Sequence, residues 1–178
     1  MPTKRTRRST MPSRAFLAKR WRELCRDKDL VDLPFKIELN KWGKIEMSPA
    51  SNCHALFQGE IISLLAVLAK RGRRLAECSV LTTDGVKVPD VAWASPEFLA
   101  RHGATTPFDQ APEICVEVMS PSNSPGEIAE KVSLYLADGA SEVWVCSETE
   151  DVTFHSMAGE LSTSNLVKRF PTRIELDT

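Results

Sequence analysis

Apolar residues recur at helical spacing in three parts of the chain. After a cap at Ser51 or Asn52, one helix is predicted to run towards Gly72 as the main core helix. A second is predicted from Ser124 to about Asp138, with a first-turn proline and a capping-box acid. A third, basic helix within 13–30 is predicted to dock through one apolar face, made of Phe16, Leu17, Trp21, Leu24 and Cys25.

Runs of β-favouring residues predict strands between these helices. A hairpin is predicted within 34–49, with its turn around 40–43. Two strands are predicted within 77–95, joined around 83–85, and Pro89 interrupts the second. Four further strands are predicted at 113–120, 142–147, 151–156 and 172–177.

This order of elements predicts an α/β or α+β fold, in which a mixed sheet is covered by helices on both faces. Residues 95–111 are predicted to form a proline-containing loop with no more than one helical turn. With 178 residues and 42% hydrophobic content, the chain can form one core of ordinary size but is short for two. We therefore predict a disordered basic arm at 1–12 and a single domain at 13–178.

The net charge of −1 conceals an asymmetry along the chain. Residues 1–28 carry ten Lys or Arg against two acids, a net charge of +8, and the other 150 residues sum to −9. The basic segment, with Arg71, Arg73 and Arg74, could contact the phosphates of a nucleic acid, although a charged helix is more often a solvated face. The acidic remainder argues against a wide DNA-binding surface.

Composition also excludes several classes of protein. The first twelve residues lack the apolar stretch of a secretory signal, and no later run approaches the ~20 apolar residues of a membrane span. A cytoplasmic protein without membrane contact is expected. The five cysteines show no CxxC spacing and the three histidines no zinc-ligand pattern, so the cysteines are expected to be reduced and mostly buried.

Two acids stand in apolar, strand-like stretches. Glu117 lies within 113–120, and Asp90 follows a proline among apolar neighbours. Burying an unpaired carboxylate costs roughly several kcal/mol, so each needs a proton, a basic partner or a cation. Adjacent strands could bring the two together around Mg²⁺ or Mn²⁺, which prefer oxygen ligands. The alternatives are a turn or capping role for Asp90, and an ion pair of Glu117 with Lys87 or an arginine.

Several short motifs occur in a specific order, and through them the chain resembles the PD-(D/E)xK nuclease superfamily. Within it, the chain resembles a large bacterial restriction-endonuclease-like family, over about residues 35–155. The resemblance implies a restriction-endonuclease-like mixed β-sheet core flanked by helices, with an N-terminal helix and hairpin. The matching pieces are residues 37–39, 47–49, His54, 88–90, 115–123, Lys131, Tyr135 and 139–145.

The resemblance also implies a metal centre, in which Asp90 and Glu117 bind Mg²⁺ or Mn²⁺ together with the carbonyl group of Val118. The superfamily pattern places a lysine two residues after the acid, but Met119 stands there. Lys131 on the following helix is therefore the candidate for a migrated catalytic lysine. The ordinary alternative for this lysine is an exposed helical ion pair with the acid four residues earlier, Glu127.

Two further residues match the family at positions close to the implied centre. Glu38 matches an acid on the first hairpin strand, and His54 lies near the start of the core helix. Both are candidates for supporting the metal or its approach. A capping or hydrogen-bonded core histidine is the ordinary alternative for His54.

The resemblance implies a metal-dependent endonuclease that hydrolyses phosphodiester bonds in DNA. A non-catalytic module on the same fold, binding nucleic acid or a protein partner, is the main alternative. An enzyme of small molecules is less favoured, because the chain has no Gly-rich phosphate loop and no nucleophile elbow. Analogy with the fold suggests a homodimer.

Overall fold

The computed structural model describes residues 11–30, 33–49, 51–103, 105–121 and 123–176. Apart from its last two residues, the predicted basic arm at 1–12 lies outside these ranges. The three predicted helices are present, and each begins after a serine whose side chain accepts a hydrogen bond from the first turn. The helices are α1 (Arg14–Leu24), α2 (Asn52–Leu68), α3 (Pro96–His102) and α4 (Pro125–Ala137).

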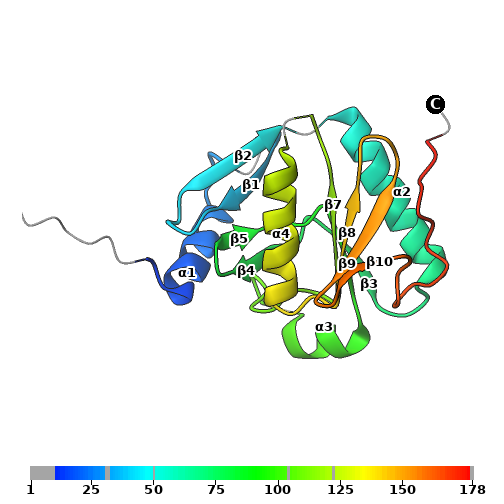
Figure 1. The fold of residues 1–178 in the computed structure, drawn as a ribbon. Coiled ribbons are helices and arrows are strands. Elements are labelled where there is room, and N and C mark those ends of the chain that lie inside the picture. The colour runs from blue at the N-terminus through cyan, green and yellow to red at the C-terminus, as the bar shows by residue number, and fades with distance from the viewer. Residues whose placement is uncertain (1–10, 31–32, 50, 104, 122, 177–178) are drawn as a thin grey trace, which may run out of the picture.

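The strands form two sheets (Figure 1). The antiparallel first sheet has the order β2-β1-β5-β4, and the second has the order β10-β9-β8-β7-β6-β3. Among the strand pairs of the described residues, β7 and β8 alone are parallel, and α4 connects them as a βαβ crossover. The strands are β1 (Phe35–Leu39), β2 (Ile45–Pro49), β3 (Arg73–Ala76), β4 (Val80–Thr82), β5 (Gly85–Lys87), β6 (Val91–Ala94), β7 (Ile114–Val118), β8 (Glu142–Cys146), β9 (Val152–Ser156) and β10 (Gly159–Leu161).

The second sheet is covered on both faces, as the sequence predicts. Successive side chains of a strand point to opposite faces, so Val116 packs in one cluster with Ile61 of α2, whereas Cys115 packs with Tyr135 of α4. In Figure 1, α4 and α2 accordingly lie on opposite sides of β7 and β8. The predicted mixed α/β class is confirmed.

The first sheet has its own small core beneath α1. Leu17, Trp21 and Leu24 pack against strand residues that include Leu39 and Val86. Two of the five residues predicted for the apolar face of this helix, Phe16 and Cys25, are exposed. The buried face is therefore narrower than predicted. The three buried residues are spaced by four and three positions and so share one face of the helix, and Phe16 and Cys25 flank that face.

The region around Pro89 differs from the prediction. The predicted second strand of 77–95 is two strands, β5 and β6, which belong to different sheets. Pro89 has no N–H to donate to a ladder, and the chain leaves the first sheet here and enters the second. Asp90 is thereby placed at the junction of the two sheets, where its N–H donates to the carbonyl of Val116 at 2.9 Å.

Other differences lie at the edges of the fold. The predicted strand at 172–177 is wrong within its described part, which contributes one isolated bridge, between Arg173 and Asp151. The strands β3 and β10 were not predicted, and α3 gives the loop at 95–111 more helix than expected.

All five cysteines are free, but only Cys115 and Cys146 are buried. Within the described residues, no helix is long and apolar enough to cross a membrane.

Candidate active site

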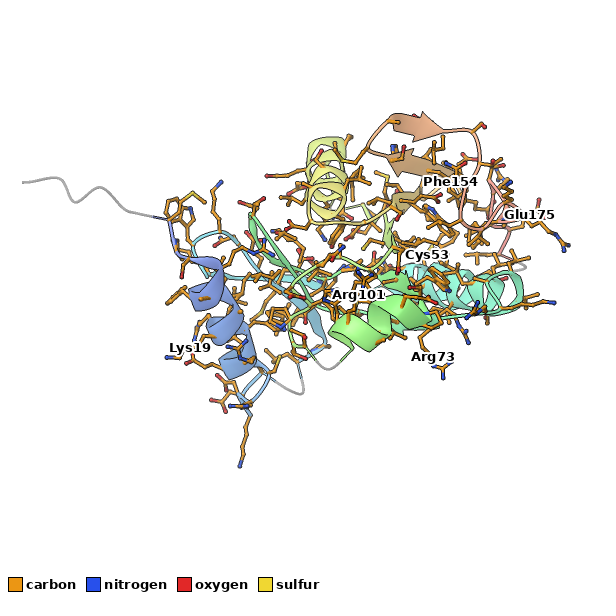
Figure 2. The ribbon with its side chains drawn as sticks, turned by 90° about the horizontal axis from the view of Figure 1, so that it is seen from below. Lys19, Cys53, Arg73, Arg101, Phe154 and Glu175 are labelled. Carbon is orange, nitrogen blue, oxygen red and sulfur yellow. The ribbon has the colours of Figure 1, made fainter. Side chains whose placement is uncertain are left out.

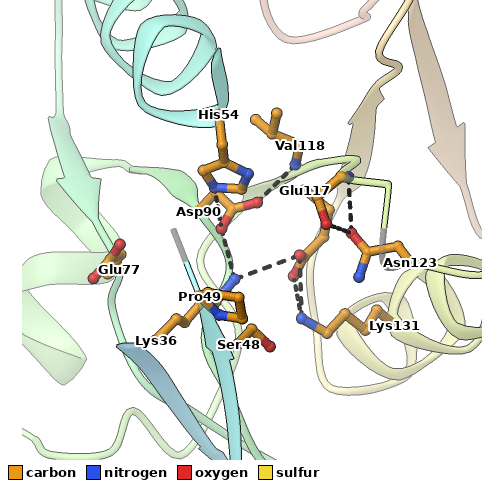
Figure 3. A pocket seen from close by; sticks show the side chains of 11 residues that line it. Lys36, Ser48, Pro49, His54, Glu77, Asp90, Glu117, Val118, Asn123 and Lys131 are labelled. Atoms are coloured by element: carbon orange, nitrogen blue, oxygen red, sulfur yellow. Dashed lines mark hydrogen bonds and ion pairs between the residues drawn. The ribbon is translucent and has the colours of Figure 1, made fainter. Parts of the chain in front are cut away.

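A pocket of about 50 Å³ is lined by residues from both sheets and from the helices α2 and α4 (Figure 3). Four of the five predicted site side chains line it, from α2, the Pro89 junction, β7 and α4: His54, Asp90, Glu117 and Lys131. The fifth, Glu38, reaches the same group through its contact with Lys131. The structure therefore brings together all of the predicted side chains, whose roles remain predictions.

Asp90 lies almost wholly out of solvent, with 1% of its surface exposed. One carboxylate oxygen, Oδ1, lies 2.6 Å from Nζ of Lys36 and 3.1 Å from Nε2 of His54. The other, Oδ2, accepts a hydrogen bond from the N–H of Val118 at 2.7 Å. Burial alone would raise the pKa of Asp90, but the hydrogen bond with His54 and the charge of Lys36 outweigh it and hold the pKa well below its usual range.

Glu117 is equally buried but has the opposite electrostatic balance. Its Oε1 accepts a hydrogen bond from the hydroxyl of Tyr135 at 2.8 Å, and Lys131 Nζ lies 3.2 Å from Oε2. Lys36 Nζ lies 3.6 Å from the same Oε2. Burial is the largest influence and raises the pKa of Glu117, with help from the negative charges of Asp90 and Glu38, despite the two lysines.

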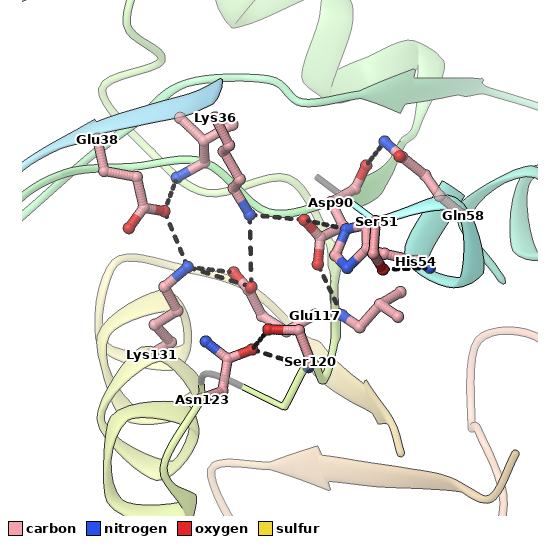
Figure 4. A network of polar contacts seen from close by, with 12 residues as sticks. Lys36, Glu38, Ser51, His54, Gln58, Asp90, Glu117, Ser120, Asn123 and Lys131 are labelled. Atoms are coloured by element: carbon pink, nitrogen blue, oxygen red, sulfur yellow. Dashed lines mark hydrogen bonds and ion pairs between the residues drawn. The ribbon is translucent and has the colours of Figure 1, made fainter. Parts of the chain in front are cut away.

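Lys131 lies at the border of the packed face of α4 and extends its ammonium group towards two acids (Figure 4). Its Nζ lies 2.9 Å from Oε1 of Glu38, which also accepts a hydrogen bond from the N–H of Val88 at 2.8 Å. Burial opposes the charge of Lys131, but Glu117 and Glu38 raise its pKa overall. The alternative partner, Glu127, instead accepts hydrogen bonds from Ser124 and caps the helix.

Lys36 is a member of the site that the sequence reasoning missed. It lies on β1, and its Nζ contacts both Asp90 and Glu117. Burial disfavours its charge, but the carboxylates around it raise its pKa. The alternation of the strand was an available signal, because it puts Lys36 and Glu38 on the same face of β1. Lys87, considered as a partner of Glu117, instead pairs with Glu46 at 3.3 Å.

The donor set is compatible with Mg²⁺ or Mn²⁺. Three carboxylates meet two ammonium groups, so these five groups together carry an excess of one negative charge. Within the described residues, no group of three or more His, Cys, Asp or Glu side chains is arranged to hold a metal. Mg²⁺, however, usually binds through one or two carboxylates, completed by water and substrate phosphate. Asp90 and Glu117 meet that lower requirement.

Comparison with known proteins assigns the chain to a family. The family model Uma2, described as "Putative restriction endonuclease", matches residues 21–176. The chain belongs to the Uma2 family. Membership in Uma2 confirms the restriction-endonuclease-like resemblance and supports a nuclease-like function. A search of curated proteins finds no match.

A solved structure supports the same fold for this Uma2 protein. The crystal structure of a putative nuclease belonging to DUF820, from Anabaena variabilis, is similar with a TM-score of 0.59. The two chains are 21% identical, and the similarity covers 67% of this chain and 71% of the other. At this identity the likeness bears on the fold, whereas the chemistry must be argued from the pocket itself.

Proposed function

We propose that this Uma2 protein is a Mg²⁺- or Mn²⁺-dependent endonuclease that hydrolyses phosphodiester bonds in DNA. One observation carries the proposal: two buried carboxylates, Asp90 and Glu117, converge with Lys131 in a single pocket. Such a cluster is costly to bury. A chain that keeps it in a pocket, and not within a sealed core, has the groups that phosphoryl chemistry requires.

In the proposed site, Asp90, Glu117 and the carbonyl of Val118 hold the metal ion. When bound, such an ion polarises a phosphoryl oxygen and makes a coordinated water more acidic. The protein's own contribution begins with orientation. His54 and the N–H of Val118 hold the two oxygens of Asp90, and the Tyr135 hydroxyl holds Glu117.

Lys131 has an electrostatic role in this proposal. Its raised pKa keeps the ammonium group protonated at neutral pH, so it donates hydrogen bonds and does not act as a base. From its position beside Glu117, it can orient a water and offset negative charge that develops on the phosphate. Glu38 fixes the ammonium group from the opposite side at 2.9 Å.

DNA as the substrate rests on the family and on the basic N-terminal region. Of the basic side chains of α1, Lys19 points away from the body (Figure 2), and Arg22 is also exposed. Arg14 is not available to phosphates in the same way, because it bonds Asp138 at 2.9 Å and two backbone carbonyls. Contacts by the predicted arm, dimerisation and a cytoplasmic location remain predictions.

One observation favours the alternative of a non-catalytic module. Asp90 and Glu117 already have basic partners, Lys36 and Lys131, so their charges are largely compensated within the protein. In that case the cluster would be a buried ion network that orients the two sheets. The two functions differ in whether the protein cleaves DNA and whether Asp90 is needed to bind a metal.

The test is cleavage of supercoiled plasmid with Mg²⁺ or Mn²⁺. We expect the wild type to nick the plasmid, and Lys131→Met to lose cleavage while it keeps its fold and its Mn²⁺ binding by calorimetry. Asp90→Asn should lose both cleavage and Mn²⁺ binding. Lys87→Met is the matched control, since it removes another buried lysine that contacts acids outside the pocket.

The outcomes separate the assignments. Cleavage retained by Lys131→Met would show that the migrated-lysine assignment is wrong. A wild-type protein that binds DNA but neither cleaves it nor binds Mn²⁺ would establish the non-catalytic module instead.

A further inference from the structure

Lys36 lies between the two carboxylates that the proposed function assigns to the metal. Its Nζ is 2.6 Å from Oδ1 of Asp90 and 3.6 Å from Oε2 of Glu117 (Figure 4). Its side chain is 12% exposed, so these contacts are not those of a solvated surface pair. The lysine comes from the first sheet, whereas both acids follow Pro89 in the chain.

An ammonium group in this position and a metal ion need the same oxygens. A divalent cation shared by Asp90 and Glu117 has to approach each carboxylate to about 2.0–2.6 Å. The ammonium group of Lys36 already uses an oxygen of each acid, and its positive charge repels a second cation nearby. Asp90 and Glu117 therefore cannot bind the metal ion and keep both contacts with Lys36 at the same time.

Lys36 and Lys131 also differ in the acids that hold them. The Lys131 ammonium lies between Glu117 and a third acid, Glu38, which is itself fixed by a backbone hydrogen bond. The ion pairs of Lys36 are with Asp90 and Glu117 alone among the described residues. It lies opposite Ser48 on β2, which also lines the pocket. Its flexible stem can move the ammonium group without a change in the strand.

We propose that Lys36 is an internal counter-cation that competes with the divalent metal for Asp90 and Glu117 and so lowers the metal affinity of the protein. This inference rests on the proposed function. In the absence of the metal, Lys36 compensates the two acids and stabilises the junction of the sheets. In this proposal, metal binding would displace the ammonium group from Asp90 and Glu117. Lys36 would still line the pocket, where its positive charge could interact with the negative charge of a substrate phosphate.

The experiment measures Mn²⁺ binding by calorimetry to the full-length protein after treatment with a chelator. Lys36→Met is expected to bind Mn²⁺ at least ~10-fold more tightly than the wild type, because a competing charge at close range has been removed. Lys36→Arg keeps the charge and should return the affinity towards that of the wild type. Lys87→Met, a buried lysine outside the pair, should leave it unchanged.

Thermal unfolding provides a second measurement. Without metal, Lys36→Met leaves two carboxylates facing each other and should unfold at a lower temperature than the wild type. Saturating Mn²⁺ should then raise its unfolding temperature by more than it raises that of the wild type. Lys36→Gln, which retains a hydrogen-bond donor, replaces Lys36→Met if the latter does not fold.

Failure of this inference is distinct from failure of the proposed function. Mn²⁺ affinity in Lys36→Met equal to or weaker than that of the wild type, with binding still lost in Asp90→Asn, overturns the competition and leaves the metal site standing. Absence of Mn²⁺ binding from both the wild type and Lys36→Met overturns the metal site itself, and the competition with it.

Discussion

Two buried acids on neighbouring parallel strands, Glu117 of β7 and Glu142 of β8, are compensated in different ways. Each is 2% exposed. Glu142 accepts four hydrogen bonds, all from neutral donors: the indole of Trp144 at 2.8 Å, the hydroxyl of Ser164 at 2.7 Å, and two backbone N–H groups at 2.7 and 3.0 Å. Among the described residues, the partners of Glu117 are one neutral donor, Tyr135, and two lysines.

The surroundings of the two acids differ accordingly. The ladder of β8 places Glu142 on the same face as Trp144, where it anchors the segment at 164–166 to the sheet. Glu117 lies on the opposite face, beneath α4, and lines a pocket. Its lysine partners come from a helix and from the other sheet.

Burial alone therefore does not separate a structural acid from a candidate catalytic one. An acid whose lone pairs are filled by neutral, local donors has a purely structural explanation. An acid held by ammonium groups beside a pocket has oxygens for which another cation could compete. The same substitution, Glu to Gln, should consequently have opposite effects at the two positions.

The largest expected effect is on cleavage by Glu117→Gln. Removal of a proposed metal ligand should lower the single-turnover cleavage rate by about 1000-fold, a loss comparable to that of a key charge-stabilising group. The free energy of unfolding should change by no more than ~1 kcal/mol, because relief of a buried charge offsets the loss of ion pairs. Plasmid cleavage and urea unfolding measure the two quantities. Undiminished cleavage would show that Glu117 is not a ligand of the metal.

Glu142→Gln should produce the reverse pattern. The amide NH₂ group would face donors where an oxygen now accepts, so the free energy of unfolding should fall by about 2–3 kcal/mol. Cleavage by the folded fraction should stay at the wild-type rate. Urea unfolding at a temperature where both proteins are folded gives the comparison. A fall in cleavage without a loss of stability would mean that Glu142 takes part in the chemistry.

A smaller effect is expected when the residue that donates a hydroxyl hydrogen bond to each acid loses that hydroxyl. Tyr135→Phe takes a hydrogen bond from Glu117 and should slow cleavage about tenfold, with ~1 kcal/mol lost in stability. Ser164→Ala takes one from Glu142 and should cost a similar stability without any change in the cleavage rate. Equal cleavage rates in the two variants would contradict a positioning role for Tyr135.

The smallest effect is on the pH dependence of stability, which should distinguish Glu117 from its neighbour Asp90. The lowered pKa of Asp90 means that its stabilising contribution is present above its ordinary value of 3.8 and is lost as pH falls through the folded value. The raised pKa of Glu117 means that its contribution is present below 4.5 and is lost as pH rises through the folded value.

With rising pH, the stability of the wild type should therefore increase relative to Asp90→Asn and decrease relative to Glu117→Gln. Urea unfolding between about pH 3 and pH 7 measures both. Changes of the same sign in the two comparisons would show that the assigned electrostatic balance is wrong at one of the acids.

The sequence predicts those parts of the fold that depend on local rules. The start of α4 follows from Ser124, Pro125 and Glu127, which form the expected N-cap, first-turn proline and capping box. The division of the strands into two sheets could not be predicted in this way. Pro89 marks an interruption, but whether the chain then returns to the same sheet depends on partners far away in the sequence.

The same limit applies to the candidate site. Asp90 and Glu117 could be found because an acid in an apolar strand is anomalous, and the family resemblance supplied Lys131. Lys36 on a hairpin strand looks like an ordinary solvated lysine. Its importance depends on a contact with a carboxylate 54 residues further along the chain, which no local pattern contains.

The division of the site between two sheets has a consequence for the order in which the site can assemble during folding. Glu117 meets Lys131 and Tyr135 within 18 residues of chain, across the β7–α4 connection. The contacts of Lys36 and Glu38 close loops of 54 and 93 residues, which have a larger entropic cost. A folding intermediate that contains only the second sheet therefore has Asp90, Glu117 and Lys131 but lacks Lys36 and Glu38, which complete their ion pairs. The complete constellation exists only after the N-terminal hairpin docks, so the chemistry of this pocket is tied to completion of the whole fold.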